Sequence, residues 1–295
     1  MNERSGSNLK AKLILLAGVF SCSMSSAFFR YMTAPSTIAA TYRLGWTGLL
    51  MTPLIFSKRE TRKELLSLKG KNLAFCGLSG LFLAMHFVVW FESLSNTSIA
   101  SSTVLVNTEV AFAAFGYLLF FGKKIRKKEI LAIGIAFLGS VVIAIADTGG
   151  GAGKNAVLGD ILALLAAFFS ACYTLIGTRE RSHMSTMVYT YVLYWGCFLS
   201  LLVFDAVSGV PMTGYEPINW IMSLCLAVFC TLLGHSVFSW SLKFLTPTYV
   251  STVKLAGPVF ASVSAILLFG EIPGLIQVAG AAVVLAGVYL YAKNS

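Results

Sequence analysis

Charged residues are scarce in this sequence of 295 residues. Asp, Glu, Lys and Arg make up 12% of the chain, whereas a soluble globular domain carries about 25%. Hydrophobic residues make up 57%, and the mean hydropathy is +0.81. This composition excludes a soluble enzyme and a disordered tail. It also excludes a nucleic-acid-binding domain, because no basic face with base-reading groups stands outside the apolar segments.

Several chemical motifs are missing as well. The six cysteines form no Cys-x-x-Cys pair and lie within apolar segments, so we expect no disulfide. His86 and His235 have no carboxylate or cysteine at ligand spacing beside them, so we expect no metal and no cofactor. The segment 149–155 (GGGAGKN) departs from a phosphate-binding loop, because Thr148 and Asn155 replace its required Gly and Ser or Thr. The absence of a nucleotide motif argues against an ATP-driven pump.

Long apolar segments dominate what is present. A helix needs about 20 mainly apolar residues to cross a bilayer. We identify ten such segments, at 11–31, 35–56, 72–92, 98–121, 129–146, 158–178, 185–205, 218–242, 247–269 and 274–292. The links between them are too short for a soluble domain. We therefore predict an all-α polytopic membrane protein with ten transmembrane helices, since a helix pairs its backbone groups internally.

The basic residues indicate an orientation. With a cytoplasmic N-terminus, 18 of the 22 Lys and Arg fall in cytoplasmic segments, and Lys154 alone falls in the opposite links. The remaining three, Arg30, Arg43 and Lys254, lie within the spans. Positive residues concentrate on the cytoplasmic side of membrane proteins. We predict a multi-pass protein of the cytoplasmic membrane with both termini in the cytoplasm, so the net charge of +10 reflects topology.

The two halves of the chain resemble each other. A shift of 149 residues aligns the first half with the second, and from about residue 110 the shift becomes 148. Identical pairs include Thr41/Thr190, Tyr42/Tyr191, Trp46/Trp195, His86/His235, Phe112/Phe260 and Gly139/Gly287. Five spans per half is an odd number, so the halves must be inverted, as in many secondary transporters whose substrate site lies between the repeats. We predict five-helix repeats at 1–147 and 158–295, joined by a Gly-rich outer link at 148–157.

Several segments resemble a known family. The stretches 234–260 and 270–287, the first-half counterpart 122–139, and the stretch 34–44 (APSTIAATYRL) are similar to the EamA-like branch of the drug/metabolite transporter superfamily. The resemblance covers essentially the whole chain and implies a ten-helix metabolite transporter. Related proteins export amino acids and other metabolites. At position 123 this sequence has Lys where relatives often carry glutamate. The resemblance therefore does not indicate which substrate this protein binds.

Charged side chains inside the spans are the candidate site. Each costs about 2.5–3.5 kcal/mol at the bilayer centre, so it needs a partner, water or a function. Arg43 suits a carboxylate or phosphate, and Glu109 suits a proton or a substrate ammonium. The structural alternatives are a Glu109–Lys254 pair, aromatic stacking of Arg43 and interhelical hydrogen bonds of the histidines. The predicted substrate-binding residues are Arg43, His86, Glu109, His235, Lys254, Tyr42, Trp90, Asn107 and Ser239, with Glu109, His86 and His235 as candidates for proton coupling.

The charge of this set is positive on balance, which favours a zwitterionic or anionic substrate. We predict a secondary active transporter that exports an amino acid or related organic acid by alternating access, with proton coupling as a further hypothesis. The alternative is a multidrug-type exporter of lipophilic organic cations that uses Glu109. An intramembrane enzyme is disfavoured, because the spans show no paired catalytic groups. The expected partners are a small-molecule substrate, the bilayer and protons, with no nucleic acid, in a monomer or homodimer.

Overall fold

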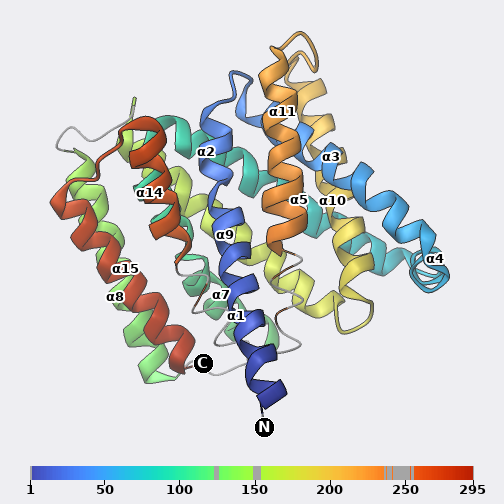
Figure 1. Ribbon diagram of the computed structural model, residues 1–295, viewed down its shortest axis with the longest axis horizontal. Coiled ribbons are helices and arrows are strands. Elements are labelled where there is room, and N and C mark those ends of the chain that lie inside the picture. The colour runs from blue at the N-terminus through green and yellow to red at the C-terminus, as the bar shows by residue number, and fades with distance from the viewer. Residues whose placement is uncertain are drawn as a thin grey trace.

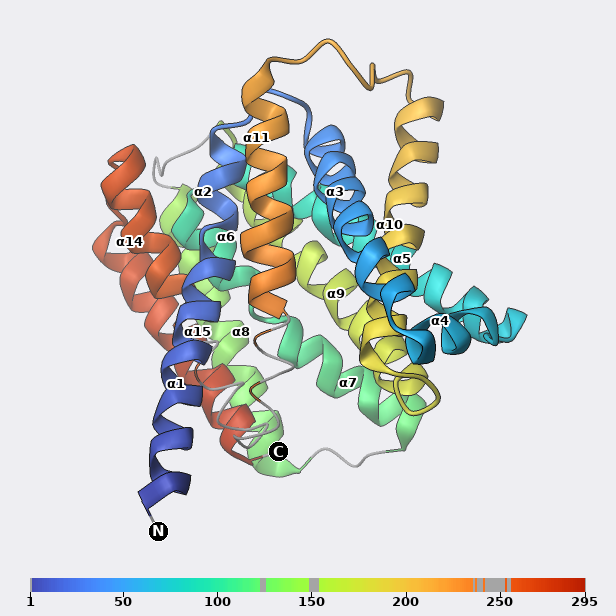
Figure 2. The ribbon, with the colours of Figure 1, turned by 45° about the vertical axis from the view of Figure 1, so that its right-hand side comes forward.

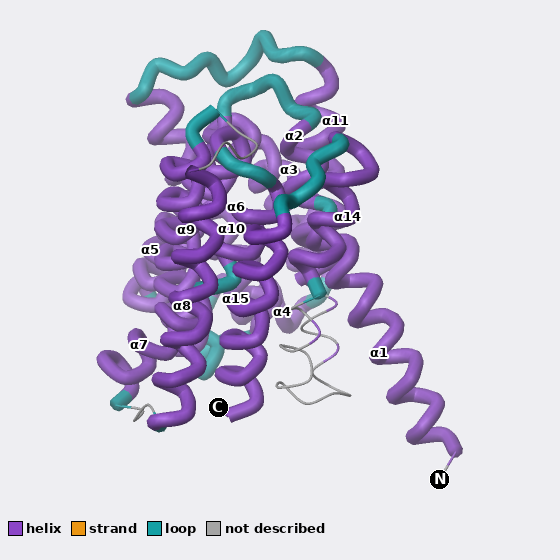
Figure 3. Tube along the Cα trace, turned by 90° about the vertical axis from the view of Figure 1, so that its left-hand side faces the viewer, coloured by secondary structure: helices purple, strands orange, loops and turns teal. Residues whose placement is uncertain are grey.

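Helices account for nearly all of the described structure. A computed structural model describes residues 2–122, 126–148, 154–235, 237, 241, 253 and 256–294, and it contains no strand among them (Figure 1). Figure 3 shows that the helices form one bundle, with both chain ends at the same end of it. The prediction of an all-α protein is confirmed for these residues.

The helices overlap the apolar segments expected from the sequence, except that most of 247–256 lies outside the described residues. The first half of the chain forms α1 (Asn2–Ser23), α2 (Ser25–Arg30), α3 (Ser36–Ser57), α4 (Arg59–Leu66), α5 (Gly70–Asn96), α6 (Ile99–Val106), α7 (Glu109–Phe121) and α8 (Lys127–Thr148). The second half forms α9 (Ala156–Glu180), α10 (Thr186–Val207), α11 (Pro217–Cys225), the π-helix η1 (Leu226–His235), α14 (Gly257–Phe269) and α15 (Leu275–Asn294).

The helices are apolar enough to lie in a membrane. Among the described residues, six segments satisfy the length and hydropathy of a span: Lys10–Arg30, Gly70–Asn96, Ile99–Phe120, Ala156–Glu180, Thr186–Val207 and Pro217–Gly234. Shorter apolar helices follow at Gly257–Phe269 and Leu275–Tyr291. Large apolar side chains face outward, with Phe120 76% and Leu267 77% exposed. Lipid solvates such a surface, so the chain is a multi-pass membrane protein. The number of ten spans remains a prediction.

The main apolar core lies between α3, α5 and α10, which pack side by side (Figure 2). Leu44, Phe91 and Cys197 are completely buried there, and Leu201 is 1% exposed. The opposite face of α5 packs against α9. Within lipid, close packing of this kind holds helices together, because the hydrocarbon around them is as apolar as their side chains.

Helices α8 and α15 form a close pair at one side of the bundle (Figures 1 and 2). A Cβ atom on Gly139 would lie 2.6 Å from the backbone nitrogen of Val284, and one on Gly287 would lie 2.5 Å from that of Ala136. Glycine therefore lets the two backbones touch, as small residues do in many membrane helix pairs. Gly139 and Gly287 are equivalent under the internal repeat.

Three of the expected helices are interrupted or distorted. Met24 separates α1 from α2, a turn at residues 107 and 108 separates α6 from α7, and α11 continues as the π-helix η1. The apolar segments 11–31, 98–121 and 218–242 still overlap the candidate spans Lys10–Arg30, Ile99–Phe120 and Pro217–Gly234. Irregular backbone at membrane depth is tolerated only where protein covers it or where it lines a cavity. These positions therefore point to the site.

Candidate functional site

Arg43 is buried in the bundle with its charge unpaired by any acid among the described residues. The side chain on α3 is 3% exposed. Its Nε donates to Thr231 Oγ1 at 3.0 Å, its Nη1 donates to Ser25 Oγ at 3.1 Å, and its Cζ lies 4.3 Å from the centre of the Phe87 ring. Both hydrogen-bonding partners are neutral hydroxyl groups, which leaves the positive charge of the guanidinium for a ligand.

The irregular helices place these two hydroxyl groups. Ser25 is the first residue of α2, directly after the interruption at Met24. Thr231 lies in η1, and its hydroxyl donates to the carbonyl oxygen of Leu226, five residues earlier, at 3.2 Å. The Thr231 oxygen is therefore oriented to accept from Arg43. Single π-helical turns are frequent at functional sites because they turn a side chain away from the regular helical position.

His86, on α5, is fixed by a backbone carbonyl and by aromatic rings. Its Nδ1 lies 2.9 Å from the carbonyl oxygen of Ala166, and since a carbonyl only accepts, Nδ1 carries the hydrogen. The imidazole stacks on Trp90, with centroids 6.0 Å apart and an interplanar angle of 16°, and it also lies beside Tyr173. The indole Nε1 of Trp90 is buried and has no hydrogen-bond partner in the described part of the chain, which makes it a free donor.

Glu109 is the first residue of α7, directly after the turn that ends α6. A helix N-terminus favours negative charge, so the interruption stabilises this carboxylate within the membrane. Its Oε2 accepts a hydrogen bond from Ser170 Oγ. Asn107, in the turn itself, donates to the carbonyl oxygen of Thr103 at 2.6 Å. Under the repeat, Glu109 corresponds to Gly257, the first residue of α14, so both halves start a helix here but only one carries the acid.

The three charged or titratable groups converge. His86 lies within electrostatic reach of both Glu109 and Arg43. Tyr173 of α9 lies within reach of Glu109, and Tyr194 of α10 lies within reach of Arg43 and Tyr173. The imidazole on α5 thus lies within electrostatic reach of a cation on α3 and of an anion on α7, and two tyrosines lie within reach of the same charges.

The structure does not bring every predicted residue to this region. Tyr42 stacks on Trp220 with centroids 4.0 Å apart and donates to the carbonyl oxygen of Met212 at 2.5 Å. Ser239, Lys254 and the side chain of His235 lie outside the described residues. Their roles, and the alternative pairing of Lys254 with Glu109, stay predictions.

Several polar neighbours of the cluster were not predicted. They are Ser25, Ser170, Tyr173, Tyr194 and Thr231. Ser170 had a signal, because it is identical to Ser21 at the shift of 149. Thr231 also had a signal, because it stands four residues before His235 on the same face of its helix, in a polar stripe with Ser239. Ser25, Tyr173 and Tyr194 had none.

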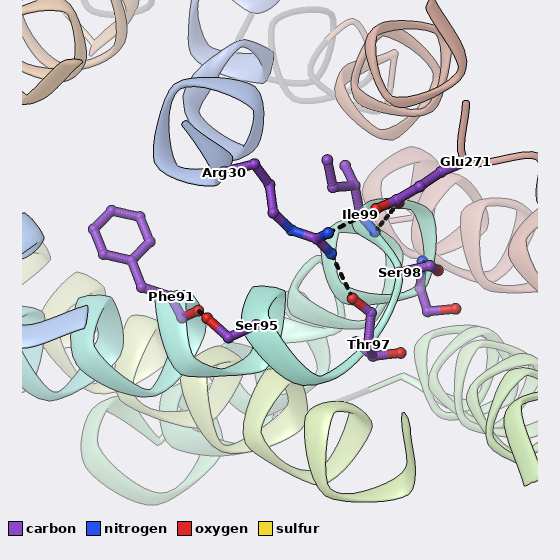
Figure 4. A network of polar contacts seen from close by, with 8 residues as sticks. Arg30, Phe91, Ser95, Thr97, Ser98, Ile99 and Glu271 are labelled. Carbon is purple, nitrogen blue, oxygen red and sulfur yellow. Dashed lines mark hydrogen bonds and ion pairs between the residues drawn. The ribbon is translucent and has the colours of Figure 1, made fainter. Parts of the chain in front are cut away.

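A second polar network joins the two halves (Figure 4). Arg30 Nη1 lies 2.7 Å from Glu271 Oε1, and Arg30 Nη2 donates to the carbonyl oxygen of Thr97 at 2.8 Å. The backbone nitrogen of Ile99 donates to Glu271 Oε2 at 3.0 Å. Gly270, with φ of +67°, ends α14 in the left-handed conformation that glycine adopts easily, and Glu271 follows it. The network ties α2, the 97–98 connection and the end of α14 together.

Apolar helices that bury charged side chains of both signs are typical of a membrane transport protein. The model of the EamA-like transporter family matches residues 9–145 and again residues 157–292. The chain therefore belongs to the EamA-like transporter family.

Relatives and a solved structure agree with this assignment. An "Uncharacterized transporter" of Archaeoglobus fulgidus is 26% identical over 256 residues, 85% of this chain and 86% of that protein. A "Probable amino-acid metabolite efflux pump" of Escherichia coli is 23% identical over 82% of this chain and 81% of its own length, and one of Salmonella typhimurium is 27% identical over 58% and 59%. A crystal structure at 15% identity has a TM-score of 0.64 and covers 96% of this chain and 97% of its own, which shows the shared fold.

Proposed function

We propose that this protein is a secondary active transporter that exports a small zwitterionic or anionic metabolite, such as an amino acid or related organic acid. The observation that carries the proposal is Arg43, a buried guanidinium with two hydroxyl partners and no acidic partner among the described residues. A substrate carboxylate supplies the missing charge in a planar, two-pronged contact. Glu109 then receives a substrate ammonium.

The direction and substrate class have support from relatives. Two proteins similar to this chain are named as probable amino-acid metabolite efflux pumps. An amino acid carries the two charges that match Arg43 and Glu109. The tyrosine rings and the free indole donor of Trp90 add apolar surface and one hydrogen bond for the rest of the substrate.

Alternating access between inverted halves is part of the proposal. The helix contacts support it, because equivalent helices of the two halves pair with each other. Thus α3 packs on α10, its equivalent in the second half, and α8 packs on its equivalent, α15. In addition, α5 packs on α9, and the helices equivalent to these two, η1 and α1, are also in contact. We propose that the end holding both termini faces the cytoplasm. In that orientation, the Arg30–Glu271 network joins α2 to the residue after α14 at the outer end.

Proton coupling is proposed for the same cluster. Glu109 accepts a hydrogen bond from Ser170 and lies within electrostatic reach of His86, so a proton bound at either group alters the attraction for a substrate cation. A carboxylate that alternately binds a proton and a substrate ammonium exchanges one for the other.

Flux into proteoliposomes tests this proposal with amino acids, organic anions and organic cations. We expect flux of zwitterions or anions. Arg43→Gln removes charge-assisted hydrogen bonds worth about 1.5–3 kcal/mol, so substrate affinity should fall by about 10- to 150-fold. Arg59→Gln, on the exposed α4, is the matched control and should match the wild type. Unchanged affinity in Arg43→Gln would contradict the assigned role.

A second candidate function is export of lipophilic organic cations. It is favoured by the rings near Glu109, since Tyr173 lies within electrostatic reach of that carboxylate and aromatic faces attract cations. In that case Glu109→Gln abolishes flux while Arg43→Gln leaves it intact. Flux of cations alone in the same panel would support this second candidate.

A further inference from the structure

A cavity of about 400 Å³ lies at one end of the bundle and shares no lining residue with the cluster around Arg43. It forms where α4 and the start of α5, from the first half, meet the end of α9 and the connection 181–185, from the second half. Small-molecule sites have volumes of about 300–1,000 Å³, so the cavity has room for a ligand larger than a single ion. Its charged and strongly polar lining residues include Glu64, Lys69, Lys71, Asn72, Arg179 and His183.

The two acids of the cavity are engaged within the protein. Glu180, at the end of α9, is 1% exposed, and its Oε2 accepts a hydrogen bond from Asn72 Nδ2 at 2.9 Å. Its Oε1 lies 3.9 Å from Arg179 Nε. Glu64 of α4 accepts a hydrogen bond from the backbone nitrogen of Ser185. Both acids thus hold the walls of the cavity together across the two halves, and neither forms an ion pair with the lysines that line it.

The cations of the cavity have fewer partners than its acids. Lys69 and Lys71 are exposed, and neither forms an ion pair with the described residues. The guanidinium of Arg179 lies over the Phe75 ring, with Cζ 4.4 Å from the ring centre. Its contact with Glu180 uses Nε, so Nη1 and Nη2 stay available as a planar pair of donors, which suits a phosphate. The cavity therefore carries a surplus of positive charge.

The first turn of α5 adds backbone donors to the wall. Lys69 is the N-cap of this helix of 27 residues, and no side chain in the described part of the chain caps it. The first N–H groups of a helix have no carbonyl partner within it. A helix N-terminus also carries a partial positive charge, which favours phosphate groups. Because Lys69, Lys71 and Asn72 line the cavity, this helix start strengthens the charge that the side chains provide.

Membrane orientation alone does not explain the arrangement of these basic residues. Helix α9 begins beside the Arg30 network, where Asn155 donates to Asn96, and it ends at Glu180, so the cavity lies at the other end of α9. In the proposed orientation this is the cytoplasmic end. The positive-inside rule is met by basic residues anywhere in the cytoplasmic links. Here basic residues from both halves of the chain converge on one cavity.

We propose that this cavity binds a phosphate group through Lys69, Lys71 and Arg179. The two lysines supply point charges, and Arg179 supplies a fork of two N–H groups to the phosphate oxygens. The imidazole of His183 adds an N–H donor from the second half. The ligand is a phosphate ester, which the headgroup of an anionic phospholipid or a soluble phosphorylated compound provides. This site is separate from the proposed transport site and does not depend on it.

Apolar side chains around the cavity favour the phospholipid as the source. Leu68 and Phe75 line the cavity itself. Leu66 and Leu73, in the adjoining turns of α4 and α5, are 76% and 51% exposed. Basic groups beside an exposed apolar surface match a phospholipid, because its phosphate lies at the membrane surface and its acyl chains lie in the hydrocarbon.

Lipid binding to the full-length protein in detergent tests the site without any transport substrate. Native mass spectrometry measures the affinity for phosphatidylglycerol. We expect Lys69→Gln combined with Lys71→Gln to weaken binding by about 10- to 30-fold, at about fivefold for each basic residue. Lys58→Gln combined with Arg62→Gln removes two exposed charges outside the cavity and should bind as the wild type does. Equal affinities in the wild type and the Lys69→Gln/Lys71→Gln protein would overturn the proposal.

Inorganic phosphate and phosphatidylcholine distinguish the two sources of the phosphate. If phosphatidylglycerol binds more tightly than phosphatidylcholine and calorimetry detects no binding of inorganic phosphate, the lipid headgroup is the ligand. If inorganic phosphate binds to the wild type and the Lys69→Gln/Lys71→Gln protein loses it, while the two lipids bind equally, a soluble phosphorylated compound is the ligand. Either result supports the site. Failure of all three probes to bind the wild type would overturn it.

Discussion

At the scale of single residues, the position of Arg43 depends on two hydroxyl groups supplied by distorted helices. Ser25 and Thr231 each accept one of its N–H groups, and the Phe87 ring lies against the guanidinium. These contacts fix the plane of the guanidinium, and in the proposed function that plane decides how a substrate carboxylate docks. The hydroxyl groups therefore act through Arg43 rather than on the substrate itself.

Thr231→Val tests this positioning role. Valine has the shape of threonine but cannot accept from Arg43 Nε, so we expect substrate affinity to fall by about 3- to 10-fold, in line with a hydrogen bond worth about 0.5–1.5 kcal/mol. Thr231→Ser keeps the oxygen and should restore affinity. The measurement is substrate binding to the purified protein. Thr52→Val, which removes a hydroxyl bonded to Tyr191 instead of Arg43, is the control. Equal affinities in Thr231→Val and Thr231→Ser would contradict the role.

The sequence could predict the identities of the site residues better than their neighbours. Arg43, His86 and Glu109 were selected because charge and imidazole are rare in apolar segments, and in the structure His86 lies within electrostatic reach of the other two. Their partners could not be selected, because serine and threonine are common in such segments. Asp205 of α10 lay at the expected end of a span, where an acid normally meets water, and only the structure shows that it is buried.

At the scale of elements, the Arg30–Glu271 network fastens one end of the bundle. The ion pair joins α2 to the residue after α14, with 25% and 14% of the two side chains exposed. Backbone groups of Thr97 and Ile99 complete the network, so both partners are held in more than one direction. A partly buried pair of this kind contributes more than an exposed one, because water screens it less.

A double-mutant cycle with Arg30→Ala and Glu271→Ala tests the network. We expect a coupling energy of about 1–2 kcal/mol in thermal unfolding of the detergent-solubilised protein, above the range of about 0.2–1 kcal/mol for exposed pairs. The charge-swapped protein with Arg30→Glu and Glu271→Arg should recover only part of the stability, because a carboxylate at position 30 would face the Thr97 carbonyl. Additive single effects would show that the two residues do not interact.

The ranges of the helices were predictable and their interruptions were not. Hydropathy locates 98–121 as one apolar segment, and the polar residues Asn107, Thr108 and Glu109 that follow Val106 fit a turn as well as one polar face of an unbroken helix. At this turn Asn107 donates to the carbonyl oxygen of Thr103, four residues earlier, whereas Glu109 accepts from Ser170, which is 61 residues away. In the π-helix η1, Thr231 likewise accepts a hydrogen bond from Arg43, which lies 188 residues earlier in the chain. Backbone irregularities of this kind depend on tertiary contacts that a local pattern does not contain.

At the scale of the whole molecule, the basic residues and the network assign the two ends of the bundle. Both termini lie at one end (Figure 3). At the other, Asn155, in the link between the halves, donates its backbone N–H to the carbonyl oxygen of Asn96, beside the Arg30 network. The positive-inside distribution supports the proposed orientation, in which the end with the termini faces the cytoplasm.

Labelling of single cysteines in intact cells tests this orientation. An impermeant maleimide should label Asn155→Cys from outside and should label Ser67→Cys, beyond α4, only after the cells are permeabilised. Both positions are exposed, so burial does not limit the reaction. The native cysteines are half-buried or buried, which keeps the background low. Labelling of Ser67→Cys alone in intact cells would reverse the assignment.

The equivalent helices α7 and α14 start at Glu109 and at Gly257, and this difference affects the number of substrate molecules carried in each turnover. Two halves alike in backbone and in charge would form two equal binding sites about their axis. Here the repeat places Val192 opposite Arg43 and Gly257 opposite Glu109. The pair of charges thus occurs once in the repeat, and we expect each turnover to carry one substrate molecule in one orientation.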